Sequence, residues 1–229
     1  MNDLDILFED SHILAINKPS GKVVNRSLTT VVSTVQDEVL DHLTFTDDEE
    51  SEFSQRGGIV HRIDKDTSGV LLIAKDIASF KRLQKQFKRR EVEKEYIAVV
   101  IGEVKDDLFE INAPIKRNPR NRMKYAVVQG GKEAVTLFEK VRVSERGGDK
   151  LTVLKCFPKT GRTHQIRVHL AAYAHPIVAD NLYSNAAQFD KWKEKFSRML
   201  LHAHKITFIH PESKAEITIE APVPHEFDI

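Results

Sequence analysis

The residues best suited to chemistry form one short polar segment, 61–69, with the sequence HRIDKDTSG. It lies between two apolar runs, residues 58–60 and 70–74, whose length and flanking turn residues predict strands. A polar loop held between strands is a common place for catalytic groups. Asp64 lies between an arginine and a lysine, which favour its ionised form, so it is a candidate nucleophile or base. The segment also suits an ordinary turn, because Asp, Thr, Ser and Gly are frequent there.

The elements that must position this segment are mostly strands. Several strand-like runs alternate apolar and polar residues, as antiparallel strands with one solvated face do. All the strand-like runs, whether or not they alternate, are residues 6–8, 13–16, 70–74, 96–101, 135–143, 151–157, 204–209 and 217–219. Asp76 can cap a helix whose apolar positions recur at helical spacing from Ile77 to Phe87, and Thr163 can begin a second helix. The expected fold class is α+β, with a mixed, mainly antiparallel sheet flanked by helices.

The bulk properties exclude several classes of protein. The chain has 229 residues, of which 41% are hydrophobic, so it can bury a packed core as one large or two small domains. The single cysteine, Cys156, excludes a disulfide framework and is expected to be a buried core thiol. The N-terminus has no basic region followed by a long apolar run, and no stretch is long enough to cross a bilayer. A cytoplasmic protein without membrane contact is expected.

The net charge of +1 conceals a segregated distribution of charge. Residues 81–94 hold seven Lys or Arg against two Glu, and residues 116–124 hold five against no acid. Residues 37–52 hold eight acids and no Lys or Arg. Separated fields of this kind can steer a polyanion towards one face of a protein. Residues 44–57 combine charge, Ser and paired Gly, which predicts a mobile loop.

Five stretches together resemble the RluA-type pseudouridine synthases. The 61–69 segment is similar to that family's His-Arg-Leu-Asp motif with its following Thr-Ser-Gly, with Ile63 in place of Leu. Residues 94–98 (KEYIA) resemble its tyrosine-bearing strand, and residues 161–169 (GRTHQIRVH) resemble its third motif. Residues 13–21 and 200–203 also match. The matches occur in the expected order from about residue 5 to about residue 222, which makes the resemblance specific.

The resemblance implies an isomerase that converts uridine to pseudouridine during rRNA or tRNA processing. The reaction cuts the N-glycosidic bond, rotates the base and joins C5 to C1′, so no cofactor and no metal are expected. It needs a nucleophilic carboxylate and a target base that has left its stack. The resemblance places the nucleophile at Asp64. It leaves open whether Asp64 attacks C1′, attacks C6 or removes the C2′ proton.

The resemblance also implies roles for residues around this carboxylate. Arg167 is expected to pair with Asp64 and keep it ionised, because an opposing charge within about 4–6 Å lowers a carboxylate pKa. Tyr96 is expected to stack on the target base, an interaction worth about 1–3 kcal/mol. Ile166 would form an apolar pocket wall. Arg62 is expected to share a side with Asp64 and to occupy the space that the flipped base leaves.

The two basic segments are expected to bind the RNA backbone through contacts that are independent of sequence and sensitive to salt. Residues 77–94 would present the basic face of a helix to phosphates. Residues 116–124 are predicted to be an extended loop or hairpin tip that reaches over an RNA stem-loop. The candidate substrate-binding residues are Lys116, Arg117, Arg120 and Arg122 of this segment and Arg162 of the third motif.

One catalytic domain spanning residues 1–229 is expected, without the N-terminal S4 domain that many members of the resembled family carry. The family fold implies a bent sheet with a basic cleft across it. Affinity would then come from the cleft and the basic loops, which favours a compact stem-loop of tRNA, of 23S rRNA, or of both. A monomer is expected because the sequence contains no long exposed apolar stripe.

Two functions of other classes are the alternatives. Residues 64–66 after an apolar run resemble the aspartyl-phosphate loop of haloacid-dehalogenase-type phosphatases, which would need magnesium. That loop expects a threonine at position 68, whereas the chain has Thr67, and the regular strand–helix alternation of that fold is missing. A non-catalytic RNA-binding protein is the second alternative, although pure binding does not require Asp64, Tyr96 and Arg167 together.

Overall fold

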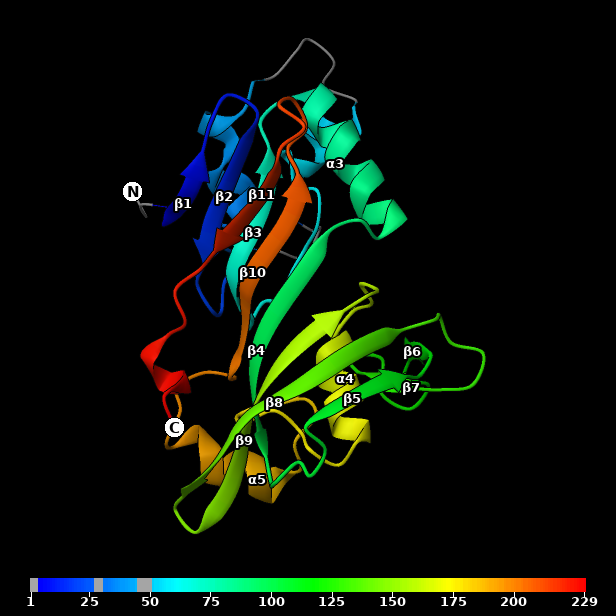
Figure 1. Cartoon of the computed structure of the whole chain (residues 1–229), viewed down its shortest axis with the longest axis vertical. Helices are drawn as coiled ribbons and strands as arrows, with labels where there is room; N and C mark the ends of the chain where they lie inside the picture. Colours follow the sequence, from blue (N-terminus) through cyan, green and yellow to red (C-terminus); the bar gives the residue numbers. More distant parts are fainter. Residues whose placement is uncertain (1–3, 27–30, 45–50) are drawn as a thin grey trace. The chain divides into compact units, whose positions relative to one another are not determined.

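The computed structural model describes residues 4–26, 31–44 and 51–229, which divide into two compact units. Unit 1 comprises Met1–Glu93 and Ala203–Pro222, and unit 2 comprises Lys94–His202 and Val223–Ile229. The polypeptide therefore passes between the units at 93/94, 202/203 and 222/223. Each unit is built from segments that lie far apart in the sequence (Figure 1).

Unit 1 is organised around a sheet in which sequence-distant strands are neighbours. The strand order is β1 (Ile6–Glu9), β2 (Ile13–Lys18), β3 (Ser68–Ala74) and β10 (Leu201–Ile209), with β11 (Glu216–Glu220) paired to β10. The β1–β2, β2–β3 and β10–β11 pairs are antiparallel. All seven residues of β3 are buried, which explains its continuous apolar sequence. The strand that follows the 61–69 segment is thus central and rigid.

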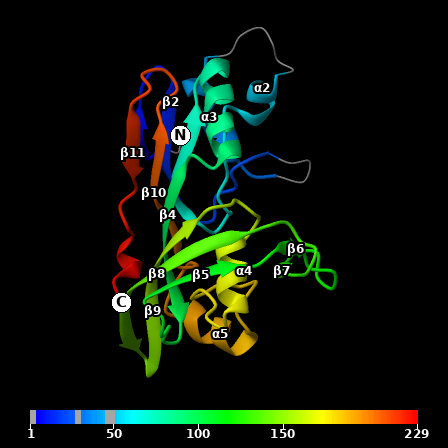
Figure 2. The same cartoon turned by 45° about the vertical axis from the view of Figure 1, so that its right-hand side comes forward.

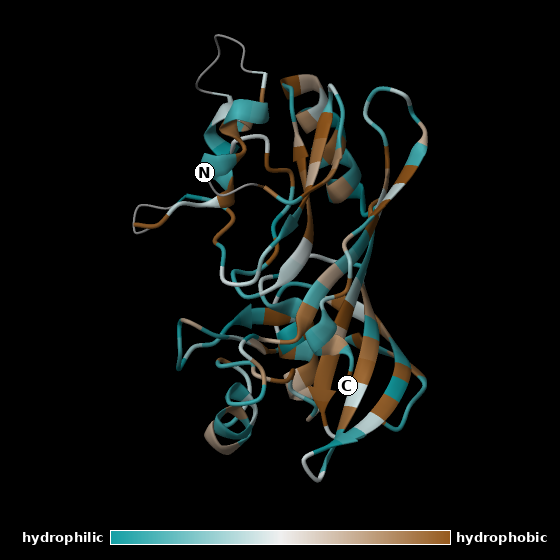
Figure 3. Cartoon of the chain, turned by 90° about the vertical axis from the view of Figure 1, so that its left-hand side faces the viewer, coloured by the Kyte–Doolittle hydropathy of each residue, from teal (hydrophilic) through white to brown (hydrophobic). Residues whose placement is uncertain are grey.

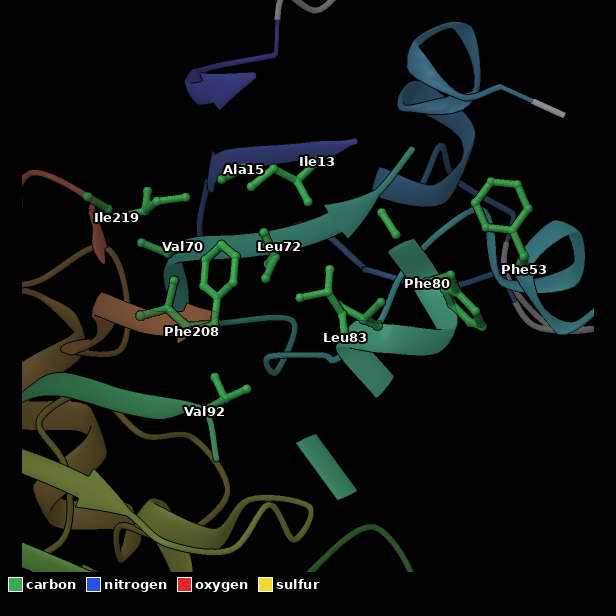
Figure 4. Close-up of a cluster of buried hydrophobic side chains, with 14 residues drawn as sticks. Ile13, Ala15, Phe53, Val70, Leu72, Phe80, Leu83, Val92, Phe208 and Ile219 are labelled. Carbon is green, nitrogen blue, oxygen red and sulfur yellow. The ribbon is translucent and has the colours of Figure 1, made fainter. Parts of the chain in front are cut away.

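The helix α3 (Ile77–Arg89) closes the core of unit 1. It begins where predicted, because the Asp76 side chain accepts a hydrogen bond from the Ser79 backbone N–H. Phe80 and Leu83 of its apolar face join Leu72 in one buried cluster (Figure 4). The opposite face carries the basic residues, as the periodicity predicted.

The prediction of a mobile loop over residues 44–57 is wrong for its second half. Residues 45–50 lie outside the described ranges, but α2 (Glu52–Arg56) forms directly after them. Ser51 caps this helix, Phe53 is 2% exposed within the core, and Gly57 ends the helix in a left-handed conformation. The burial of Phe53 and the two helix caps therefore stabilise a helix in a segment whose polar composition favours a loop. The short α1 (Val35–Glu38) and η1 (Leu40–His42) precede it.

Unit 2 contains four strands that are neighbours in the sheet and pair antiparallel. They run β4 (Glu93–Ile101), β9 (Asp149–Pro158), β8 (Val135–Arg146) and β5 (Leu108–Asn112). A hairpin of β6 (Ile115–Arg117) and β7 (Tyr125–Val127) forms its own two-stranded sheet. The helices are α4 (Gln165–Ala172), α5 (Ala186–Lys193) and the terminal η2 (His225–Phe227).

The second half of β4 is buried on both faces of the sheet. Along β4, Ala98 and Val100 join the cluster that packs on α4, whereas Ile97 and Val99 join the cluster around Trp192. This follows from the period of two in a strand, and bands of differing hydropathy along these strands are visible in Figure 3. Cys156 lies fully buried in the first cluster, and burial raises the pKa of its thiol. The expected core thiol is confirmed.

The predicted α+β fold with a mixed, mainly antiparallel sheet is confirmed. Each of the eight strand-like runs in the sequence overlaps a strand of the structure. Residues 58–60 are not a strand, because only Ile59 makes an isolated bridge, to Ile73. The second predicted helix begins two residues later than Thr163, with His164 as its N-cap. Within the described residues, no helix is both long and apolar enough to span a membrane.

Candidate active site

Asp64 lies in the loop that leads into β3 of unit 1. Ile63 is 4% exposed, whereas Arg62 is exposed and Asp64 is half-buried. Exposure therefore differs from residue to residue along this loop. The expectation that Arg62 and Asp64 share a side stays a prediction, because these residues are not part of a strand.

A buried lysine fixes the backbone directly after Asp64. Lys18, at the end of β2, is 0% exposed, and its ammonium donates to three backbone carbonyls. These are the carbonyls of Pro19 at 2.8 Å, Lys22 at 2.9 Å and Lys65 at 2.9 Å. Ser20 adds a hydrogen bond from its hydroxyl to the Asp66 carbonyl at 2.7 Å. Because a buried charge must be solvated by protein groups, these bonds tie the loop that carries Asp64 to the segment after β2.

Two further residues of the 61–69 segment have structural roles. The Leu72 backbone N–H donates to Nε2 of His61 at 2.9 Å, and the His61 ring stacks on Phe87 with centroids 4.8 Å apart. Gly69 has φ +110°, and a Cβ there would lie 2.1 Å from the Ala203 carbonyl oxygen of β10. Only glycine allows this close approach of two strands. His61 is thus a hydrogen-bonding support for the loop.

Tyr96 and Ile166 are brought together by unit 2. Tyr96 lies on β4 opposite Cys156 and is half-buried against the apolar cluster that contains Ile166, which is 6% exposed. Lys94 lies two residues before Tyr96 on the same strand, hence on the same face. Burial lowers the pKa of Lys94 to about 8. The tyrosine that would stack on a base thus packs in an apolar cluster and shares its strand face with a partly buried lysine.

Arg167 is a buried residue of α4, 2% exposed, and it is held by a partner that sequence reasoning missed. Its Nε donates to Oδ2 of Asp180 at 2.7 Å and its Nη2 donates to Oδ1 at 2.8 Å. Asp180 is 0% exposed, and its Oδ1 also accepts the backbone N–H groups of Leu182 and Tyr183. A bidentate pair of this kind fixes the plane of the guanidinium as well as its position.

Backbone strain flanks this ion pair. His164, three residues before Arg167, has φ +57°, and Ala179, directly before Asp180, also has φ +57°. Residues other than glycine rarely adopt this left-handed region. Such strain persists only where the surrounding structure over-determines the backbone, and it gathers at functional sites. Both halves of the ion pair are therefore presented by constrained segments.

The basic segment 116–124 comprises the end of β6 and the connection to β7, which is the predicted hairpin tip, and the hairpin reaches out past α4 (Figure 2). Lys116, Arg117, Arg120 and Arg122 are all exposed. The turn is ordered by Asn118, whose Oδ1 accepts the backbone N–H groups of Arg120 and Asn121. Two exposed cations thus lie on β6 and two on the turn that follows it.

Arg162 is more constrained than the hairpin residues. It is half-buried, its Nε donates to the Glu133 carbonyl at 2.8 Å, and its backbone N–H donates to Oε1 of Gln165 at 3.0 Å. These bonds hold the start of α4. Any role of Arg162 towards a substrate would have to use the rest of its guanidinium.

The candidate residues are divided between the two units. Arg62 and Asp64 belong to unit 1, whereas Tyr96, Arg162, Ile166, Arg167 and the hairpin belong to unit 2. The pairing of Asp64 with Arg167 therefore stays a prediction. Among the residues described, no group of three or more His, Cys, Asp and Glu side chains is arranged to hold a metal ion.

Comparison with known proteins yields one consistent family. The family model described as RNA pseudouridylate synthase matches residues 12–172. Ribosomal large subunit pseudouridine synthase D of Xylella fastidiosa is 39% identical over 231 residues, covering 97% of this chain and 67% of that protein. The protein of the same name from Neisseria meningitidis serogroup B is 41% identical over 234 residues, covering 97% and 59%. The chain thus spans between 59 and 67% of the length of these two relatives.

The fold gives the same result. Human RNA Pseudouridylate Synthase Domain Containing 1 superposes with a TM-score of 0.75 at 25% identity, covering 96% of this chain and 83% of that one. Human RNA Pseudouridylate Synthase Domain Containing 4 gives a TM-score of 0.72 at 22% identity, covering 97% and 90%. The second likeness bears on the fold alone.

Proposed function

Because the chain belongs to the RNA pseudouridylate synthase family, we propose that it isomerises specific uridines of RNA to pseudouridine with Asp64 as the nucleophile. The matched range, 12–172, contains Asp64, Tyr96 and Arg167, and this is the observation that carries the proposal. The predicted family and the predicted enzyme class, an isomerase acting on RNA, are confirmed, and the phosphatase alternative is wrong.

The proposed mechanism assigns one task to each residue. Asp64 attacks the nucleotide from a loop whose backbone Lys18 holds, so little reorganisation is needed at the moment of reaction. Arg167, fixed by Asp180, keeps the Asp64 carboxylate ionised and aimed. Tyr96 stacks on the flipped base beside Ile166, which keeps the detached uracil in place.

We further propose that both units act as one catalytic domain, with a basic cleft for the substrate. The nucleophile and Arg62 are in unit 1, whereas the aromatic and the arginine partner are in unit 2, so neither unit holds a complete site. Arg62 is exposed, as a side chain that replaces a flipped base must be. The enzyme is proposed to act as a monomer in the cytoplasm.

The proposed substrate is a stem-loop of large-subunit rRNA, with tRNA as the second choice. Relatives that cover nearly all of this chain are named for the ribosomal large subunit. The four exposed cations of the β6–β7 hairpin suit a folded RNA, which proteins recognise by shape and backbone.

The test of the reaction uses the C5 hydrogen of uridine, which leaves when C5 joins C1′. Purified protein is incubated with RNA that carries [5-³H]uridine and is isolated from cells lacking the gene, and released tritium is counted. We expect release by the wild type and by Asp41→Asn, an exposed acid of unit 1, and none by Asp64→Asn. Carbodiimide mapping of the same RNA then identifies the site. Equal release by Asp64→Asn would contradict the mechanism.

Binding is measured on the same proteins to separate catalysis from affinity. Asp64→Asn removes one negative charge and no contact to phosphate, so it should bind the RNA as well as the wild type does. If the wild type binds RNA and releases no tritium, the chain is a binding protein and the catalytic proposal fails.

A further inference from the structure

Tyr183 is a half-buried side chain that contacts both the basic hairpin and the arginine of the proposed catalytic site. Its hydroxyl accepts the backbone N–H of Tyr125 in β7 at 2.9 Å. Its ring lies under the guanidinium of Arg167, with 5.1 Å between that group's central carbon and the ring centroid. Both contacts are within unit 2.

The hairpin side of this arrangement is closely packed. Arg117 and Tyr125 are opposite each other in the β6–β7 ladder, and the Arg117 guanidinium lies 5.5 Å from the Tyr125 ring centroid. Ile115 of β6 packs with Tyr125 and Tyr183 in one small apolar cluster that also includes Val168 of α4. A phosphate bound by Arg117 would therefore restrain the residue paired with Tyr125 of β7, whose backbone N–H donates to the Tyr183 hydroxyl.

The arginine side is equally constrained. The backbone N–H of Tyr183 donates to the same Asp180 oxygen that accepts from Nη2 of Arg167. The Tyr183 hydroxyl also lies 2.8 Å from Nδ1 of His164, the strained N-cap residue of the helix that carries Arg167. One residue thus contacts the guanidinium and the start of its helix through its side chain, and the carboxylate partner through its backbone N–H.

We propose that Tyr183 is a positioning residue that couples binding of the RNA backbone at the β6–β7 hairpin to the alignment of Arg167. The proposal rests on the proposed function, since it takes RNA as the ligand of the hairpin and Arg167 as part of the site. A substrate that engages the hairpin holds β7 in place, and the hydroxyl of Tyr183 passes that restraint to α4. Substrates that miss the hairpin leave Arg167 less well aligned.

The substitution that isolates this role is Tyr183→Phe. It keeps the ring against Arg167 and removes only the hydroxyl that joins β7 to His164. Tyr173→Phe is the matched control, because Tyr173 lies at the other end of α4 and donates its hydroxyl to Asp106. Both variants lose one phenol oxygen from the same helix region.

The experiment is a double-mutant cycle of Tyr183→Phe with Arg117→Ala, followed by kcat and KM on the mapped stem-loop. In the wild-type background, Arg117→Ala should raise KM, and it should also lower kcat. We expect a change of about three- to tenfold in each, which corresponds to the loss of one or two hydrogen bonds. In the Tyr183→Phe background it should raise KM only. With Tyr173→Phe the effect on kcat should be the same as in the wild type. An equal effect of Arg117→Ala on kcat with and without the Tyr183 hydroxyl overturns the coupling.

A second readout does not need turnover. The Nε–H of Arg167, bonded to Asp180, gives a proton–nitrogen NMR signal that reports the alignment of its guanidinium. Adding the stem-loop to Asp64→Asn protein should shift this signal by a larger amount when Tyr183 is present than in the Tyr183→Phe protein. A shift of the same size in both proteins overturns the coupling. If the wild type makes no pseudouridine but this signal responds as expected, the catalytic proposal fails and the coupling stands.

Discussion

At the scale of single residues, the candidate site depends on two buried ions whose charges are solvated by the protein itself. Lys18 uses three backbone carbonyls, and Asp180 accepts two bonds from Arg167 and two from backbone N–H groups. The bidentate pair with Asp180 fixes the orientation of the Arg167 guanidinium, which the proposed mechanism uses to hold and aim Asp64.

His169 of the third motif provides a test at this scale. It is 0% exposed, with Nε2 3.1 Å from the Ala113 carbonyl and Nδ1 3.0 Å from the Thr136 hydroxyl. Burial lowers its pKa from the ordinary value of 6.5, because the charged form loses water. As pH falls through 6.5 the unfolded chain binds a proton that the folded chain does not bind. The free energy of unfolding should therefore decrease below that pH.

The measurement is denaturant unfolding between pH 7.5 and about pH 5, a range above that in which carboxylates with lowered pKa titrate. His169→Gln keeps a donor for the Ala113 carbonyl and cannot be protonated. Its stability should depend less on pH in this range than that of the wild type. Identical slopes for the two proteins would show that His169 does not contribute.

The sequence predicted the site residues that lie in local motifs. It did not predict the supporting residues whose partners are distant in the sequence. The buried Cys156 and the helix that Asp76 caps are local properties, and both are as predicted. Lys18 reaches Lys65 over 47 positions, and Asp180 reaches Arg167 over 13. No periodicity joins such pairs, because their contact is created by the fold and not by the adjacent sequence.

At the scale of elements, long strands and amphipathic helices were predictable, whereas short ones were not. The helix after Asp76 combines a cap with a complete apolar stripe, so it forms as predicted. β6 and β7 have three residues each, too few to show an alternation, and only their basic turn was anticipated. α2 has five residues and depends on the burial of Phe53, which composition does not reveal.

The β6–β7 hairpin allows a test of the electrostatic contribution of one element. Replacing Lys116, Arg117, Arg120 and Arg122 by glutamine should weaken RNA binding and flatten its salt dependence. Four lost phosphate contacts predict a decrease of about 3 in the slope of log K against log salt concentration. Filter binding at several salt concentrations measures the slope.

The control removes the same number of charges from the same unit. Lys105, Lys140, Lys150 and Lys159 each pair with an acid in the structure. Their replacement by glutamine should leave the slope within about one unit of the wild-type value. If both sets of substitutions flatten the slope equally, the effect comes from net charge and not from the hairpin.

At the scale of the whole molecule, the proposed site residues belong to two units, so activity is predicted to depend on the folding of both. The polypeptide passes between them three times, at 93/94, 202/203 and 222/223. Each unit has its own buried cluster, with Leu72 in that of unit 1 and Leu154 in that of unit 2, both 0% exposed. Replacing either leucine by alanine should cost about 2–5 kcal/mol of stability in its own unit.

We predict that Leu72→Ala abolishes turnover at the temperature at which unit 1 unfolds. Leu154→Ala should abolish turnover at the temperature at which unit 2 unfolds. Hydrogen exchange followed by mass spectrometry identifies the open unit, through peptides from β2 and β3 for unit 1 and from β8 and β9 for unit 2. Tritium release is measured at the same temperatures. In Leu72→Ala, activity should disappear together with protection of β3, because the loop that carries Asp64 leads into that strand. Turnover that continues while β3 exchanges freely and β8 stays protected would mean that unit 2 alone performs the reaction, and Asp64 could not be its nucleophile.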